Sequence, residues 1–127
     1  MTLIYDAGVL VAAYRNDRRV WADHRVRLEL GLAPATTAPV IAEGSRSPRQ
    51  AQLRRLLRGC DVIPFSQEHA HKVGALLAKA RTSDVVDAHI AVVASELDGR
   101  ILTSDPDDLQ HLVNQLQRRV AVKTLND

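Results

Sequence analysis

Short apolar runs alternate with longer segments of helical periodicity along the 127 residues of the chain. Four of the short runs predict β-strands, and Pro64 places the second of them at an edge or end of a sheet. The expected strands are Thr2–Tyr5, Cys60–Phe65, Arg100–Ser104 and Arg119–Leu125, and Thr36–Pro39 is expected to be a turn or a very short strand. Because predicted helices separate these runs, the pattern indicates one α/β domain over residues 1–127, with a mostly parallel central sheet of four to five strands.

Apolar residues spaced three and four apart predict the helices, and capping residues, glycine and proline mark their ends. Ser66 and Ser83 are expected to cap two of them, and Pro106 follows Asp105 at the favoured first position of the last one. The predicted helical segments are Gly8–Tyr14, Val20–Leu32, a helix from about Val40, Gln50–Arg58, Gln67–Arg81, Asp84–Leu97 and a helix from Asp105.

Composition narrows the class of protein. Cys60 is the single cysteine, so no intrachain disulfide can form, which fits a reducing compartment such as the cytoplasm. No run approaches the roughly 18 apolar residues of a membrane span. The net charge of +2 is too small to indicate a nucleic-acid partner by itself, and aromatic residues are too scarce for a base-stacking platform of the RRM or OB type. We therefore expect a cytoplasmic protein without a membrane partner.

The acidic residues provide the candidate chemistry. Asp6 ends the first predicted strand and Asp105 ends the strand before the last helix, so their carboxylates converge if those strands are neighbours. Asp84 and Asp87 are three residues apart near the start of an apolar helix and can share a face, and Glu43 lies early in another helix. Carboxylates gathered in this way repel one another, and Mg²⁺ or Mn²⁺ would relieve that repulsion. Such a ligand set is typical of a metal-dependent nuclease.

Each acid also has a purely structural interpretation. Asp105 is a good N-cap before Pro106, with Asp108 in the position of a capping-box acid. Asp84 is favoured by the helix dipole alone. Asp6 and Asp87 are harder to explain structurally, because an acid in an apolar segment is costly if it is buried without a partner.

Other residue types offer weaker candidates. The five histidines lack zinc-like spacing and are interpreted as surface or packing residues, and Cys60 as a small apolar filler. A run of arginines is either a solvated helix face or a contact for an RNA backbone or an acidic partner. Its candidate contact residues are Arg46, Arg49 and Arg54.

The order of the acidic blocks resembles the PIN domain, and more narrowly the VapC-type ribonuclease toxins of toxin–antitoxin pairs. The resemblance covers essentially the whole chain, and its last two blocks are the most specific. The blocks are Leu3-Ile4-Tyr5-Asp6, Val40-Ile41-Ala42-Glu43, Asp87-Ala88-His89-Ile90-Ala91 and Leu102-Thr103-Ser104-Asp105.

The resemblance implies a PIN-like three-layer fold and an Mg²⁺- or Mn²⁺-dependent endoribonuclease that cleaves structured RNA such as tRNA or rRNA. It implies a catalytic set of Asp6, Glu43, Asp87 and Asp105, with the metal held by Asp6, Asp87 and Asp105. It further implies supplementary roles for Asp84, Ser104 and Asp108, inhibition by a cognate antitoxin, and a homodimer. The family often has Ser or Thr directly after the first Asp, whereas this chain has Ala7-Gly8.

Two alternatives remain open at this point. One is a PIN-like scaffold for RNA or protein that has lost catalysis, which the Ala7-Gly8 departure favours. The other is a phospho-acceptor receiver domain, which suits the length and the α/β alternation but lacks adjacent acids after the first strand and a lysine after the last. The RNA cleaved, the identity of the antitoxin, the oligomeric state and the choice between Mg²⁺ and Mn²⁺ do not follow from the sequence.

Overall fold

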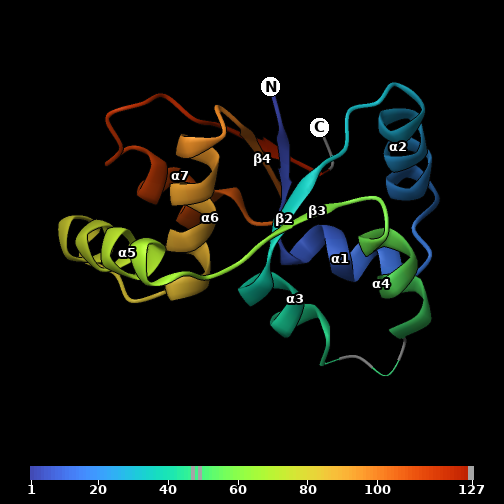
Figure 1. Cartoon of the computed structure of the whole chain (residues 1–127), viewed down its shortest axis with the longest axis horizontal. Helices are drawn as coiled ribbons and strands as arrows, with labels where there is room; N and C mark the ends of the chain where they lie inside the picture. Colours follow the sequence, from blue (N-terminus) through green and yellow to red (C-terminus); the bar gives the residue numbers. More distant parts are fainter. Residues whose placement is uncertain (47, 49, 126–127) are drawn as a thin grey trace.

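A five-stranded parallel sheet in the order β3-β2-β1-β4-β5 forms the centre of the protein (Figure 1). The computed structural model describes residues 1–46, 48 and 50–125. The strands are β1 (Leu3–Tyr5), β2 (Ala35–Thr37), β3 (Asp61–Ile63), β4 (Arg100–Thr103) and β5 (Ala121–Thr124). The predicted α/β fold is confirmed, the short segment at residues 35–37 is a strand, and the strand before Pro64 lies at an edge of the sheet as predicted.

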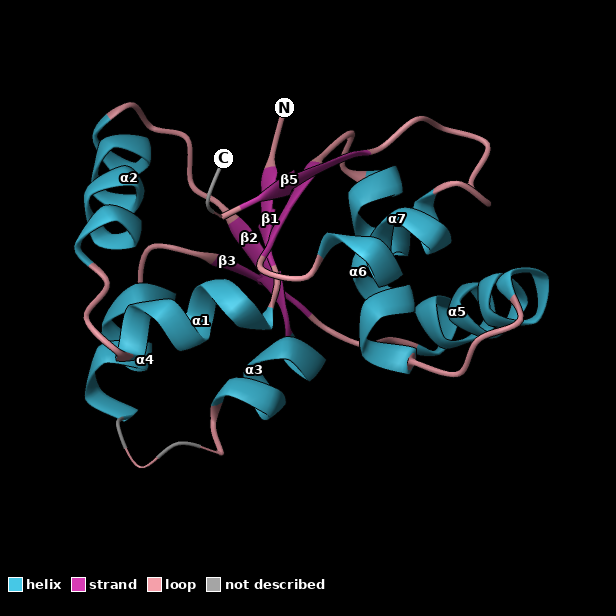
Figure 2. Ribbon diagram, turned by 180° about the vertical axis from the view of Figure 1, so that it is seen from behind, coloured by secondary structure: helices cyan, strands magenta, loops and turns pink. Residues whose placement is uncertain are grey.

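Helices cover both faces of the sheet. Figures 1 and 2 show α1, α2 and α4 on one side and α5, α6 and α7 on the other, with α3 following the end of β2. The helices are α1 (Ala7–Tyr14), α2 (Arg18–Glu29), α3 (Ala38–Gly44), α4 (Gln50–Leu57), α5 (Gln67–Ala80), α6 (Val85–Glu96) and α7 (Pro106–Val113). In the described part of the chain, none of these helices is long and apolar enough to cross a membrane.

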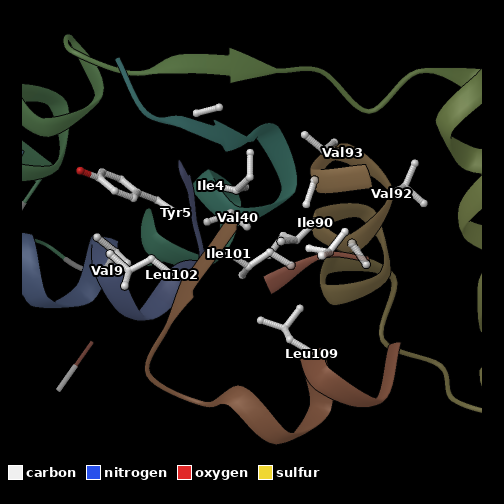
Figure 3. Close-up of a cluster of buried hydrophobic side chains, with 14 of the residues drawn as sticks. Ile4, Tyr5, Val9, Val40, Ile90, Val92, Val93, Ile101, Leu102 and Leu109 are labelled. Carbon is white, nitrogen blue, oxygen red and sulfur yellow. The ribbon is translucent and has the colours of Figure 1, made fainter. Parts of the chain in front are cut away.

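The core lies between the two central strands and the helices beside them (Figure 3). Ile4 of β1 and Ile101 of β4 are fully buried, as is Ile90 of α6. In α6 seven consecutive residues, 88–94, are buried, because the helix packs against the sheet, α5 and α7. Burial all round explains why the middle of α6, apart from His89, is apolar on every face. It also holds the first turn of α6 firmly at the carboxyl edge of the sheet.

The prediction for the start of α6 was wrong by one residue. Asp84, and not Ser83, is the N-cap, and its Oδ1 accepts a hydrogen bond from the backbone N–H of Asp87 at 3.0 Å. Both residue types are good caps, so the sequence alone does not choose between adjacent candidates. Ser66 caps α5 as predicted, through its hydroxyl and the N–H of His69.

Candidate active site

The carboxyl ends of β1 and β4 bring two of the predicted acids to the same edge of the sheet. The strands are neighbours, with Tyr5 in register with Leu102. Asp6 follows β1 directly, and its backbone N–H donates to the carbonyl oxygen of Leu102 at 3.0 Å. Asp105 lies just beyond the end of β4, at the N-cap position of α7. β1 and β4 are therefore neighbours, as the predicted convergence of the Asp6 and Asp105 carboxylates requires.

Asp6 is the most buried of the candidate acids, with 8% of its surface exposed. Its Oδ1 accepts a hydrogen bond from the N–H of Ala7 at 2.7 Å and caps α1, and its Oδ2 accepts one from Thr103 Oγ1 at 2.7 Å. Burial raises the pKa of Asp6, these two hydrogen bonds oppose the rise, and the charges of Asp84 and Asp105 add to it. Because both oxygens are held, the carboxylate has a fixed orientation toward the edge of the sheet.

Thr103 is a site residue that the sequence analysis missed. Its side chain is fully buried at the end of β4. The hydroxyl donates to Asp6 and accepts a hydrogen bond from the backbone N–H of Asp105 at 3.0 Å, so one group links the two acids. The available signal was a hydroxyl residue two positions before Asp105. Alanine at position 7 offers no hydroxyl group next to Asp6. The hydroxyl that contacts Asp6 comes instead from Thr103 on the neighbouring strand.

Asp87 has the most strongly perturbed ionisation among the candidate acids. It lies in the first turn of α6, partly buried, with its backbone held by the Asp84 cap. Burial raises the pKa of Asp87 from 3.8 to about 7, and the neighbouring carboxylates contribute in the order Asp84, Asp6, Glu43 and Asp108. Acids from the starts of α1, α6 and α7 and from the end of α3 thus act on one carboxyl group. The structure brings them into a single electrostatic cluster.

Glu43 reaches this cluster from the end of α3, and the prediction that it lies early in its helix was wrong, because the helix begins at Ala38 and not at Val40. Thr37 caps that helix by accepting a hydrogen bond from the N–H of Val40 at 3.3 Å, and Pro39 lies in its first turn. Burial raises the pKa of Glu43, the charges of Asp84 and Asp6 raise it further, and Arg46 lowers it. Glu43 therefore faces the same acids as Asp87, although the acidic block that contains it was the least specific in the sequence.

The alternative, purely structural interpretation of Asp105 as a side-chain cap is contradicted by the structure. Asp105 occupies the N-cap position of α7, but its side chain makes no capping hydrogen bond, so its carboxylate is available for another role. Asp108 lies in the first turn of α7 and contributes to the raised pKa of Asp87. Asp84 does act as a helix cap, and its charge also acts on Asp6, Glu43 and Asp87.

Gly8 in the Ala7-Gly8 pair has a steric explanation. A Cβ atom on Gly8 would collide with the side chain of Ser104 and lie 3.1 Å from its backbone nitrogen. Gly8 thus allows α1 to begin directly against the residue that precedes Asp105. Ser104 itself is exposed, and this contact places its side chain beside the start of α1.

The basic candidates differ in their relation to the acids. Arg46 follows α3 and acts electrostatically on Glu43. Arg54 is exposed on α4, and Arg49 lies outside the described residues. Cys60 is partly buried, its thiol donates to the carbonyl oxygen of Leu56, and burial raises its pKa to about 12, which agrees with a filler that stays protonated.

Two of the histidines form a chain between α5 and α6. His89 is fully buried and its Nε2 lies 2.8 Å from Nδ1 of His69, whose Nε2 lies 2.8 Å from Glu96. Phe65 packs edge-on against the His89 ring, with the two ring centroids 4.8 Å apart. These contacts agree with the predicted packing role for both residues.

The donor chemistry of the cluster fits a hard divalent cation. Its side chains offer carboxylate and hydroxyl oxygens, and burial first and neighbouring carboxylates second raise the pKa values of Asp6, Glu43 and Asp87. Within residues 1–46, 48 and 50–125, no three acidic, histidine or cysteine side chains are already arranged as metal ligands. Mg²⁺ keeps several of its waters in proteins and does not require a complete protein cage, so the residues fit this ion.

Comparison with known proteins identifies the family. The PIN domain model matches residues 3–114. The chain belongs to the PIN-domain family. No curated protein sequence matches it.

Solved structures of this fold are similar over nearly the whole chain. VapBC2 from Rickettsia felis, bound to a promoter DNA fragment, has a TM-score of 0.75 at 18% identity and covers 98% of both chains. DNA-bound VapBC from Salmonella typhimurium has a TM-score of 0.70 at 11% identity and also covers 98% of both chains. FitAcB from Neisseria gonorrhoeae has a TM-score of 0.67 at 17% identity and covers 96% of both. These likenesses establish that the chain shares their fold.

Proposed function

We propose that this PIN-domain protein is a metal-dependent endoribonuclease and the toxin of a VapC-type toxin–antitoxin pair. The observation that carries the proposal is the electrostatic cluster around Asp87, whose pKa of about 7 reflects burial beside four other carboxylates. Folding does not require several carboxylates of like charge in one place. A nuclease that binds divalent cations does need them.

The proposed roles follow from how each side chain is held. Asp6, Asp87 and Asp105 would hold Mg²⁺ or Mn²⁺, and Glu43, which is exposed, would orient the attacking water. The bound cation would lower the pKa of that water and stabilise charge on the phosphate oxygens. Thr103 keeps the Asp6 carboxylate turned toward the site, and Asp84 fixes the first turn of α6 so that Asp87 stays at the edge of the sheet. Ser104 and Asp108 would be supplementary polar groups.

The proposed partners are RNA, a cognate antitoxin and a second copy of the chain. Support for the antitoxin comes from the structurally similar VapBC and FitAcB proteins, of which the two VapBC proteins are bound to DNA. Structured RNA such as tRNA or rRNA is the proposed substrate, and Cys60 as the single cysteine supports action in the reducing cytoplasm.

A catalytically silent PIN scaffold is the second candidate function. Two observations favour it: alanine at position 7, and a cluster that contains no ready-made group of three ligands in the described part of the chain. Membership of the PIN family leaves the receiver-domain alternative without support.

Cleavage of total cellular RNA by the purified protein tests the proposal. The protein is incubated with Mg²⁺, with Mn²⁺ or with EDTA, as wild type and as Asp6→Asn. Asparagine keeps an oxygen to cap α1, so the fold is retained while the negative charge is lost. Discrete fragments that require the metal and disappear in the variant are expected.

Asp61→Asn is the matched control, because Asp61 is exposed at the start of β3, away from the carboxyl edge of the sheet. It should cleave RNA at the wild-type rate. Absence of cleavage with either metal, in folded protein free of antitoxin, would favour the scaffold. Wild-type cleavage by Asp6→Asn would refute the assigned site.

A further inference from the structure

A second feature lies directly beside the acids and is not explained by them. A cleft of about 700 Å³ opens between α1, α2 and the ends of β4 and β5. It begins at Ala7 and Gly8, which follow Asp6, and at Ser104, which precedes Asp105. Figure 2 shows β5 running toward the side of the molecule that carries α2. One end of the cleft therefore lies next to the residues that carry Asp6 and Asp105, although none of the candidate acids lines it.

The charge of this cleft is opposite to that of the acidic cluster. The ionisable residues that line it are Arg15, Arg19, Arg27, Lys123, Asp17 and Asp23. Four cations thus face two carboxylates, and one of these, Asp17, is engaged in capping α2 through the N–H of Val20 at 3.1 Å. A polyanion that approached the acids alone would be repelled, and the cations beside them offset that repulsion.

Arg27 is a cation of the cleft that side-chain contacts hold in place. Its guanidinium donates from one NH1 group to the hydroxyl of Tyr5 at 3.0 Å and lies over the same ring, 5.7 Å from its centroid. The Tyr5 hydroxyl also lies 2.8 Å from Nδ1 of the buried His24, and burial raises the pKa of Tyr5 to about 12, so the phenol stays protonated. Tyr5 is the residue before Asp6. One buried network therefore fixes a guanidinium in the cleft wall and the strand end that carries the first acid.

The lining also indicates which part of a nucleic acid it would contact. The described residues of the cleft include no aromatic ring on which a base could stack. A preorganised guanidinium with further N–H donors suits phosphate oxygens. A contact of this kind reads the backbone and not the base.

We propose that this cleft binds the phosphodiester backbone of the RNA strand on one side of the bond to be cut. Arg27 is the contact that the Tyr5 packing holds in place, and Arg15 and Lys123, both exposed, are the further contacts. This inference rests on the proposed function, because it assigns a second binding region to the same substrate. It predicts RNA binding with little base preference and a strong dependence on salt.

Binding of a labelled single-stranded RNA in EDTA, followed by fluorescence anisotropy over a series of KCl concentrations, tests the inference without cleavage. The variant is the double substitution Arg15→Gln and Lys123→Gln, which leaves the Arg27–Tyr5 packing intact. Loss of two phosphate contacts should weaken binding and reduce the slope of log K against log salt by about 1.4. Arg119→Gln, which changes an exposed arginine before the start of β5, is the matched control and should bind as wild type.

Cleavage with Mg²⁺ separates this inference from the proposed function. If the wild type cleaves RNA and the double variant has a raised KM with a nearly unchanged kcat, the cleft assignment is supported. If the wild type cleaves RNA but the double variant binds it with wild-type affinity and salt slope, the inference is wrong and the nuclease stands. Poly-glutamate, a model acidic peptide, is tested as a second ligand. If the double substitution weakens only the binding of poly-glutamate, the cleft binds an acidic peptide and the inference is also wrong. If the wild type neither binds nor cleaves RNA, both proposals fail.

Discussion

Removal of the Asp87 charge should stabilise the protein at alkaline pH. The pKa of Asp87 is about 7 in the folded chain, against an ordinary value of 3.8. Because the folded state favours the protonated form, ionisation of Asp87 costs stability. The cost is absent below about pH 4, grows as the pH rises through 7, and is complete above it. Asp87→Asn removes this cost, since asparagine does not ionise.

The size of the effect follows from the pKa of Asp87. A rise from 3.8 to about 7 corresponds to roughly 4 kcal/mol at pH 8, at about 1.4 kcal/mol for each tenfold change. Asp87 is only partly buried, so solvent screening reduces this figure to about 2–4 kcal/mol. That is a large fraction of the stability of an ordinary domain. The same charge is what the site would need to bind a cation, so stability and function are opposed here.

Urea denaturation in EDTA measures the predicted effect. The free energy of unfolding of Asp87→Asn should exceed that of the wild type by about 2–4 kcal/mol at pH 8 and should match it within error near pH 4. Added Mg²⁺ should stabilise the wild type at pH 8 and have less effect on the variant. Asp61→Asn serves as the control for a surface charge. If Asp87→Asn is no more stable than the wild type at pH 8 in EDTA, burial and the neighbouring acids do not raise the pKa of Asp87 as the structure indicates.

Two further substitutions test how the site is held. Thr103→Val removes the hydrogen bond to Asp6 and should lower the free energy of unfolding by about 1–3 kcal/mol and slow RNA cleavage, whereas Thr103→Ser should retain both properties. Equal cleavage by the valine and serine variants would show that the hydroxyl does not position Asp6. Gly8→Ala forces a Cβ against Ser104 and should cost about 1–3 kcal/mol in thermal or urea unfolding. A Gly8→Ala protein as stable as the wild type would mean that the start of α1 has room to move.

Sequence reasoning reached the architecture because the signals for it are local. Alternating apolar runs and capped helices identify the elements, and the position of Asp6 and Asp105 after two strands follows from them. Whether β1 and β4 are neighbours depends on tertiary structure. The sequence could therefore predict only that the two carboxylates converge if these strands pair. The wrong assignment of the α6 cap to Ser83 came from two adjacent residues with equal capping ability.

The roles within the site depended on atoms that sequence does not position. Asp105 precedes Pro106 as a capping residue would, yet its side chain makes no cap. Thr103 looked like an ordinary β-branched strand residue, and only the register of β1 against β4 brings its hydroxyl to Asp6. The cleft beside the acids is formed by α1, α2 and the sheet together, so no run of sequence could predict it.

The central position of β1 has a consequence for the order in which the chain folds. The hydrogen bond between Asp6 and Thr103 joins residues 97 positions apart, and β1 cannot pair with β4 until both are available. Closing so long a loop is entropically costly and makes such contacts late events in folding. During synthesis at about 5–20 residues per second, the first acid leaves the ribosome several seconds before its partner strand. The candidate acidic site therefore cannot be complete on a growing chain until the last fifth of the domain has emerged.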